Sequence, residues 1–263
     1  MSQTSEPGTT APGQPADSSD DAMLDGRVRL LQPARGYRAA IDAVLLAATV
    51  PVCAGEHILD VGCGVGAASL CLLARAASAG LSDVRVVGLE VHDDFLALAR
   101  RNALRVSAHG RFEVVAGDVA APPPGLGLFD HVMSNPPYLP ADRADPSPDR
   151  GKALATVEST ADLATWLGFC VDVLRPGGTL SLVHRADRQA EIVALVQSRL
   201  SDVTVLPLLP RVGVPAKRLI LRARRGGVGG LRVLPGLALH RLDGGYTESA
   251  NAILRDAQAL DLD

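Results

Sequence analysis

Alternating strand-like and helix-like segments between residues 57 and 200 constrain the fold of this 263-residue chain more than any other feature. A repeated order of strand, helix and strand is typical of a parallel sheet with helices on both faces. We therefore predict an α/β protein with a Rossmann-like, doubly wound, mostly parallel seven-stranded sheet. The predicted strands are 57–61, 84–90, 112–115, 129–134, 179–184, 203–206 and 217–223, and the predicted helices are 42–49, 67–79, 94–106, 162–174 and 187–200.

The two ends of the chain differ from this central part. Residues 1–22 are rich in Ser, Thr, Pro, Gly and Asp and lack hydrophobic periodicity, which predicts a disordered tail. Residues 23–225 form the predicted main domain, including a helical lead-in before the first strand. Residues 226–263 form a predicted small C-terminal extension packed on that domain, with a hairpin from 231–234 and 237–240 and a helix from Glu248.

Composition bounds the class of protein. Hydrophobic residues make up 47% of the chain but aromatic residues only 3%, so the core must be built from Leu, Val, Ala and Ile. The N-terminus lacks the features of a signal peptide and no apolar run is long enough to cross a membrane, so we expect a cytoplasmic protein. The four cysteines show neither zinc-ligand nor disulfide spacing, which predicts no metal and buried, reduced thiols; they are Cys53, Cys63, Cys71 and Cys170.

The net charge of −3 argues against a chain that coats nucleic acid, but the charges are unevenly distributed. Residues 211–232 contain seven basic residues and no acidic one, and such a stretch could neutralise phosphates. A solvated edge strand explains it equally well. The seven residues are Arg211, Lys217, Arg218, Arg222, Arg224, Arg225 and Arg232.

Three predicted strands end in residues suited to one ligand. Gly62, Gly64 and Gly66 follow the first strand in the spacing G-x-G-x-G, which lets the backbone turn tightly and approach a ligand. The longer spacing G-x-G-x-x-G of dinucleotide sites is absent, which disfavours an NAD-dependent oxidoreductase. Glu90 ends the second strand and could accept ribose hydroxyls, and Asp118 follows the third and could accept from an adenine amino group.

The fourth predicted strand leads directly into Asn135-Pro136-Pro137-Tyr138. A planar amino or amide nitrogen is a poor nucleophile, and acceptors aimed at its N–H hydrogens orient its lone pair. Asn135 offers a side-chain oxygen, and Pro136 offers a backbone carbonyl in a segment that cannot become helical. Tyr138 offers an aromatic face for stacking. The segment therefore predicts methyl transfer to such a nitrogen, although Asn-Pro also occurs in simple turns.

Together these motifs resemble the amino-methylating branch of the class I S-adenosylmethionine-dependent methyltransferases. From about Leu24 to the C-terminus, the chain is most similar to bacterial tRNA(Val) adenine-N6 methyltransferases, which modify an adenine beside the anticodon. Further matches to that family are Gln32, Gly36-Tyr37-Arg38, Asp42, Pro207-Leu208-Leu209-Pro210-Arg211, Pro215-Ala216-Lys217-Arg218, Leu239-His240 and Asp243-Gly244-Gly245-Tyr246-Thr247.

The resemblance implies S-adenosylmethionine as the cofactor and a tRNA as the substrate, with no metal or membrane. The sequence leaves the oligomeric state open, with a monomer favoured. Asn135 to Tyr138 would hold the target adenine. The implied cofactor-binding residues are Asp60, Gly62, Cys63, Gly64, Gly66, Glu90, Asp118 and Asn135, with Tyr37 and Arg38 near the methionine end of the cofactor or the substrate entrance.

Other acceptors stay open. The same tetrapeptide would serve a protein glutamine-N5 methyltransferase, but only about 34 residues separate the tail from the first strand, too few for a separate substrate domain. Guanine-N2 methylation of rRNA and adenine-N6 methylation of DNA use the same chemistry. An RNA-binding module without catalysis is a further alternative. The Pro- and Asp-rich segment 141–148 departs from the family pattern directly after the tetrapeptide.

Overall fold

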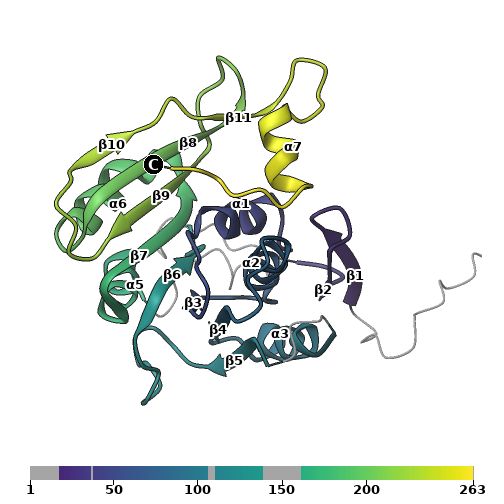
Figure 1. Cartoon of the computed structure of the whole chain (residues 1–263), viewed down its shortest axis with the longest axis vertical. Helices are drawn as coiled ribbons and strands as arrows, with labels where there is room; N and C mark the ends of the chain where they lie inside the picture. The colour runs from purple at the N-terminus through teal and green to yellow at the C-terminus, as the bar shows by residue number, and fades with distance from the viewer. Residues whose placement is uncertain (1–17, 37, 106–109, 139–160, 263) are drawn as a thin grey trace, which may run out of the picture.

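The computed structural model describes residues 18–36, 38–105, 110–138 and 161–262. Its centre is a sheet whose strands run in the order β10-β8-β9-β7-β6-β3-β4-β5, with β11 also paired to β8 (Figure 1). All pairs in this sheet are parallel except those made by β9. The strands are β3 His57–Val61, β4 Arg85–Glu90, β5 Phe112–Ala116, β6 Phe129–Ser134, β7 Leu174–Arg185, β8 Ser201–Arg211, β9 Arg218–Arg224, β10 Leu231–Val233 and β11 Leu237–His240.

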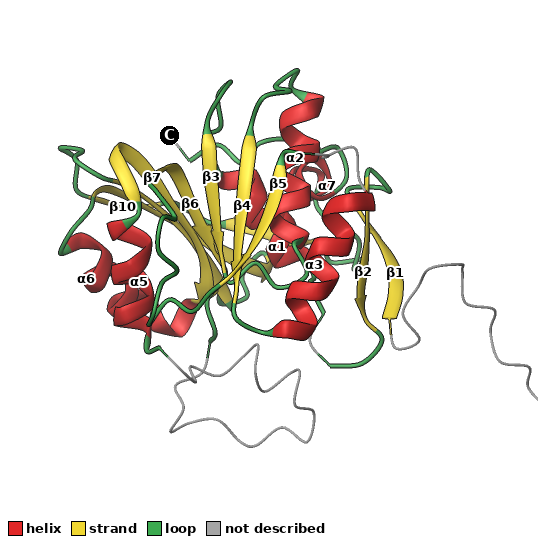
Figure 2. Ribbon diagram, turned by 90° about the horizontal axis from the view of Figure 1, so that it is seen from below, coloured by secondary structure: helices red, strands yellow, loops and turns green. Residues whose placement is uncertain are grey.

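Helices cover both faces of this sheet, which confirms the predicted α/β class (Figure 2). One face carries α1, α2 and α3, and α7 packs against α1. The other face carries α5 and α6. The helices are α1 Ile41–Thr49, α2 Ala67–Ser78, α3 Asp93–Arg105, α5 Leu163–Asp172, α6 Gln189–Gln197 and α7 Glu248–Leu254, with a 3-10 turn η2 at Ala186–Arg188. No described helix is long and apolar enough to cross a membrane.

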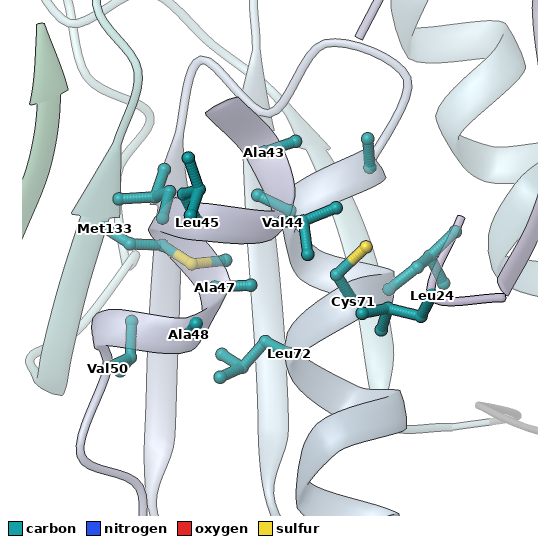
Figure 3. Packing of buried hydrophobic residues seen from close by; sticks show 14 of the residues in the cluster. Leu24, Ala43, Val44, Leu45, Ala47, Ala48, Val50, Cys71, Leu72 and Met133 are labelled. Atoms are coloured by element: carbon teal, nitrogen blue, oxygen red, sulfur yellow. The ribbon is translucent and has the colours of Figure 1, made fainter. Parts of the chain in front are cut away.

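Helix α1 is buried along most of its length, because it packs against the sheet and against α2 beside it (Figure 3) and is covered by α7. Leu45 and Leu46 are fully buried, and Met133 of β6 lies in the same cluster. Burying one such side chain contributes about 1.5–3 kcal/mol. This packing fixes the N-terminal turn of α1, where Asp42 lies.

The first residues of the described chain form a hairpin, so the predicted disordered tail was too long. Strands β1 (Ser18–Met23) and β2 (Val28–Pro33) pair in antiparallel fashion. The missed signal is Asp25-Gly26, a hairpin dipeptide between two strand-forming runs. Arginines from elsewhere in the chain pair with the acids of β1, as Arg105 does with Asp20. The remainder of the predicted tail, residues 1–17, lies outside the described residues.

Buried Asn102 of α3 joins this hairpin to the loop after β3. Its Oδ1 accepts from the backbone N–H of Leu31 at 2.7 Å, and its Nδ2 donates to the carbonyl oxygens of Leu31 and Val65, each at 2.9 Å. Since an unpaired buried amide is costly, these three bonds fix α3 against both segments. The hairpin is thus attached to the loop that carries the glycines.

The C-terminal strands do not form the predicted hairpin with each other. Both β10 and β11 pair in parallel with β8, so they extend the predicted seven strands on one side. Pro235 lies between them and cannot donate to the ladder, which explains the interruption. Without these strands β8 would be an open sheet edge, a position that proteins usually cover.

Candidate active site

The predicted site residues meet at one edge of the sheet. Strands β3, β4, β5 and β6 are parallel neighbours, so their carboxyl ends lie together. In the ladder Val61 of β3 pairs with Leu89 of β4 and with Ser134 of β6. The glycine turn, Glu90 and Asn135 follow these three residues directly, and Asp118 follows β5.

The glycine turn has the backbone that its sequence predicts. Gly62, Gly64 and Gly66 have φ angles of +70°, +57° and +84°, a region that other residues rarely adopt. A Cβ at Gly62 would lie 2.9 Å from the Trp166 ring, and one at Gly66 would lie 2.6 Å from Phe112. A Cβ at Gly64 would meet nothing within 4 Å. Side chains therefore pack against the first and third glycines of the turn, whereas the space beside the middle glycine, Gly64, is open.

Glu90 organises this turn. Its Oε2 accepts from the backbone N–H of Gly64 at 2.8 Å, and its Oε1 accepts from the N–H groups of Val91 at 2.9 Å and His92 at 2.8 Å. A carboxylate offers about four acceptor positions, so capacity for a hydroxyl donor is left. Glu90 lies at the carboxyl end of β4, as its position in the sequence predicted. Its carboxylate also holds the glycine turn in place, which the sequence did not predict.

Asp60 and Cys63 point into the protein. Asp60 Oδ2 accepts from Ser69 Oγ at 2.7 Å. Burial raises the pKa of the Asp60 carboxyl to about 7, and the charge of Glu90 adds to this, while the Ser69 bonds oppose it. Burial also raises the pKa of the Cys63 thiol well above its usual range. That thiol packs against Gly88, so Cys63 can face a ligand only through its backbone.

The remaining predicted cofactor residues have different outcomes. Asp118 Oδ1 accepts from the N–H of Ala120 at 2.9 Å, which shapes the turn after β5. Arg38 turns toward the β1–β2 hairpin, where it pairs with Asp21 and donates to Ser19 Oγ at 2.7 Å. Among the described residues, no contact joins Arg38 to the tetrapeptide. Tyr37 lies outside the described residues, as does the segment 141–148.

The tetrapeptide is held by residues from distant parts of the chain. Tyr138 Oη donates to Asn135 Oδ1 and lies 3.2 Å from Asp42 Oδ2. Arg218 Nε lies 3.3 Å from the same Asp42 oxygen, and its guanidinium lies 4.6 Å from the centre of the Tyr138 ring. At that distance the contact is a cation–π interaction. Asp42 of α1 and Arg218 of β9 therefore belong to the site, although sequence reasoning assigned Asp42 no role and Arg218 only a possible role in neutralising phosphates.

A buried histidine lies against the same tyrosine. The rings of Tyr138 and His184 meet edge to face at 5.2 Å between centroids. Burial, and to a smaller extent the positive charge of Arg188, lowers the pKa of His184 to about 4. The imidazole is therefore neutral at pH 7, and the ring that packs against Tyr138 carries no charge.

Trp166 is a further site residue to which the sequence assigned no role. Its Nε1 donates to Ser134 Oγ at 2.9 Å, and Ser134 Oγ donates to the carbonyl oxygen of Val61 at 2.8 Å. The indole also packs against Gly62. It thus braces the ends of β3 and β6 together. The available signal was that this is the single tryptophan of a chain with few aromatic residues.

The structure divides the basic stretch between two edges of the sheet. Arg218 pairs in the ladder with Arg185 at the carboxyl end of β7, whereas Arg224 pairs with Thr179, six residues earlier in that strand. Arg224 donates to the carbonyl oxygen of Gly177 at 3.0 Å, and Arg225 donates to that of Val171 at 3.2 Å. Arg224 and Arg225 therefore bind backbone oxygens of β7 and α5, away from the glycine turn.

The cysteines and acids of the described residues do not gather into a metal site. Cys63, Cys71 and Cys170 are buried free thiols, as predicted. Cys53 is exposed, which corrects the expectation of four buried thiols. It follows α1 in a loop at the opposite end of the strands.

Comparison with known proteins identifies the family. Residues 58–148 match a family model described as a methyltransferase domain. A tRNA1(Val) (adenine(37)-N6)-methyltransferase from Aeromonas hydrophila is 30% identical over 190 residues, which cover 70% of this chain and 75% of the relative. This chain belongs to that family. Another member, from Porphyromonas gingivalis, is 31% identical over 65% of this chain and 69% of its own length.

Solved structures agree with this family. A structure described as a predicted O-methyltransferase from Agrobacterium tumefaciens has a TM-score of 0.67 and 26% identity, covering 84% of this chain and 98% of that chain. An S-adenosylmethionine-dependent O-methyltransferase from Thermotoga maritima has a TM-score of 0.51 at 18% identity, over 74% of this chain and 68% of that chain, and shows the shared fold. The protein is an S-adenosylmethionine-dependent methyltransferase.

The residues at the sheet edge fit this cofactor. The open space above Gly64 allows a ligand to approach the backbone. Glu90 supplies a fixed carboxylate that can accept hydroxyl hydrogens, and Asp118 supplies another one strand further along. No strong positive charge is needed in the turn, because this cofactor has no phosphate.

Proposed function

We propose that this chain transfers the methyl group of S-adenosylmethionine to N6 of adenine 37 in tRNA1(Val). The observation that carries the proposal is the position of Asn135-Pro136-Pro137-Tyr138 at the carboxyl end of β6, beside the glycine turn of β3. The names of the relatives support the choice of base and tRNA. We infer that the enzyme acts in the cytoplasm, where its tRNA substrate would be found.

The residues of the tetrapeptide have distinct roles in this proposal. Asn135 Oδ1 and the Pro136 carbonyl oxygen accept the two N6 hydrogens, which orients the nitrogen lone pair. Pro136 and Pro137 hold the backbone extended, and the Tyr138 ring positions the adenine by stacking, worth about 1–3 kcal/mol. These groups act on the acceptor and leave the cofactor to the neighbouring strand ends.

Cofactor binding falls to the turn and the acids. Gly62, Gly64 and Gly66 allow close backbone approach, Glu90 accepts from the ribose, and Asp118 accepts from the adenine amino group. When bound, S-adenosylmethionine supplies a methyl group on a positively charged sulfur. In the transfer, the cofactor would give up this methyl group, with cleavage of its carbon–sulfur bond, to the amino nitrogen that Asn135 and Pro136 hold, and that nitrogen would release one proton to water. No general base is required among the protein side chains.

A methyl-transfer assay with three acceptors tests this proposal. Labelled S-adenosylmethionine is incubated with the enzyme and unmodified tRNA, rRNA or release-factor protein, and the labelled product is hydrolysed and identified. We expect N6-methyladenosine in the tRNA. Label in a protein glutamine or in rRNA guanine would keep the chemistry of the tetrapeptide and overturn the substrate.

A further inference from the structure

The hydroxyl group of Tyr138 lies between two acceptors. It donates to Asn135 Oδ1, and it is also 3.2 Å from Asp42 Oδ2. A phenol has one hydroxyl hydrogen, so it can donate fully to only one acceptor at a time. Asn135 and Asp42 therefore compete for the same hydrogen.

This competition affects the oxygen that the proposed function assigns to the substrate. When the Tyr138 hydroxyl donates to Asn135 Oδ1, it occupies one of the two lone pairs of this amide oxygen and withdraws electron density from the oxygen. The amide oxygen then accepts less well from the adenine amino group. The catalytic site is better prepared when the hydroxyl hydrogen points elsewhere.

The surroundings of Asp42 favour a hydrogen bond from the Tyr138 hydroxyl to its carboxylate. This carboxylate lies in the first turn of α1, a helix that is buried against the sheet, α2 and α7. Arg218 Nε lies 3.3 Å from the same oxygen, and the Arg218 guanidinium covers the Tyr138 ring at 4.6 Å from its centre. Arg218 thus contacts both Asp42, the acceptor, and Tyr138, the donor, and holds the two side chains beside each other. A hydrogen bond to a carboxylate is stronger than one to a neutral amide, so it favours Asp42 in the competition.

We propose that Asp42 is a positioning residue that draws the Tyr138 hydroxyl hydrogen away from Asn135 and so leaves the amide oxygen of Asn135 free for the target amino group. This inference rests on the proposed function of Asn135. It assigns to Asp42 a role exerted through Tyr138, without contact between Asp42 and the adenine.

Rescue by a second substitution tests the inference. In Asp42→Ala the hydroxyl keeps Asn135 as an acceptor and loses Asp42, and we expect the single-turnover rate of methyl transfer to fall about tenfold, the scale of one hydrogen bond. Tyr138→Phe keeps the ring without the hydroxyl, and we expect a rate within about twofold of the unaltered enzyme. The double variant Asp42→Ala/Tyr138→Phe removes the competing donor. We expect its rate to return to that of Tyr138→Phe.

Controls separate this role from a structural one. Asp187→Ala removes an exposed acid that pairs with Arg185 at the same edge, and its rate should not change. S-adenosylmethionine affinity should be equal in all variants, and thermal unfolding checks that each is folded. A double variant as slow as Asp42→Ala, or slower, overturns the inference, because a merely structural loss would not be rescued. Failure of the unaltered enzyme to methylate tRNA would instead overturn the proposed function.

Discussion

Asp60 illustrates how burial alone changes the chemistry of one residue. Its carboxyl lies beneath the glycine turn, hydrogen-bonded to Ser69, and burial raises its pKa from 3.8 to about 7. The motif that contains Asp60 suggested contact with the cofactor, but the printed sequence cannot show that the side chain is enclosed. Whether its charge is present at neutral pH therefore depends on the fold.

A pH dependence of stability follows from Asp60. Between about pH 4 and pH 7 the folded protein retains a proton on this carboxyl that the unfolded chain has released, so the free energy of unfolding falls as pH rises. The shift corresponds to at most about 4 kcal/mol. Asp60→Asn should remove this decrease. Urea unfolding of both proteins at pH 5 and pH 7.5 measures it, and parallel losses of stability in both would contradict the assignment.

Residues of the site that lie close in sequence were predictable, and those that assemble over long distances were not. Asn135 to Tyr138 and the glycines were identified because local spacing carries their chemistry. Asp42, Trp166 and Arg218 come from three other segments, and each reaches the site through tertiary packing. A single sequence gives no measure of such contacts.

At the scale of elements, periodicity predicted the main strands and helices, most of them within a few residues, but β7 begins five residues before its predicted start and β8 ends five residues after its predicted end. Strand β6 and strand β11 have the predicted bounds. The failures were the β1–β2 hairpin, where β1 carries two acidic residues and was predicted to belong to a disordered tail, and the pairing of β10 and β11, where adjacency in sequence suggested a hairpin. In both cases the partners are fixed by interactions with remote residues, such as Asn102 with Leu31.

The glycine turn gives a test of packing between elements. The substitution Gly66→Ala puts an alanine into the left-handed region of φ and places its Cβ 2.6 Å from Phe112 of β5. Gly80→Ala is the matched control, because Gly80 has a similar φ of +79° and no atom within 4 Å of its Cβ position. We expect about 1–2 kcal/mol of lost stability in the control and about 1–3 kcal/mol more in Gly66→Ala. Equal losses in urea unfolding would show that Phe112 yields without cost.

At the scale of the whole molecule, the basic residues of the stretch 211–232 are divided between the two ends of the sheet strands. Arg211 ends β8, and Lys217 precedes β9, so both lie at the edge that carries the tetrapeptide. Both are exposed. Arg222 and Arg224 lie further along β9, toward the opposite edge. Proximity to the target base therefore favours Arg211 and Lys217 as phosphate contacts.

The salt dependence of tRNA binding distinguishes the two groups. Arg211→Gln/Lys217→Gln should lower the slope of log affinity against log salt by up to about 2, since each phosphate contact contributes about 0.9. Arg222→Gln/Arg224→Gln, which removes the same charge, should leave the slope unchanged. Fluorescence anisotropy with a tRNA1(Val) transcript measures both. An equal fall in the two variants would show that net charge matters and that position does not.

Methylation of adenine 37 is tested most directly by mass-spectrometric mapping of methylated nucleosides in a tRNA1(Val) transcript after incubation with S-adenosylmethionine and either the unaltered enzyme or Asn135→Ala. We expect N6-methyladenosine at position 37 with the unaltered enzyme. With Asn135→Ala we expect a rate lower by orders of magnitude and little change in cofactor affinity, because Asn135 acts on the acceptor nitrogen. Methylation at another base, or an undiminished rate without the Asn135 side chain, would contradict the proposed function.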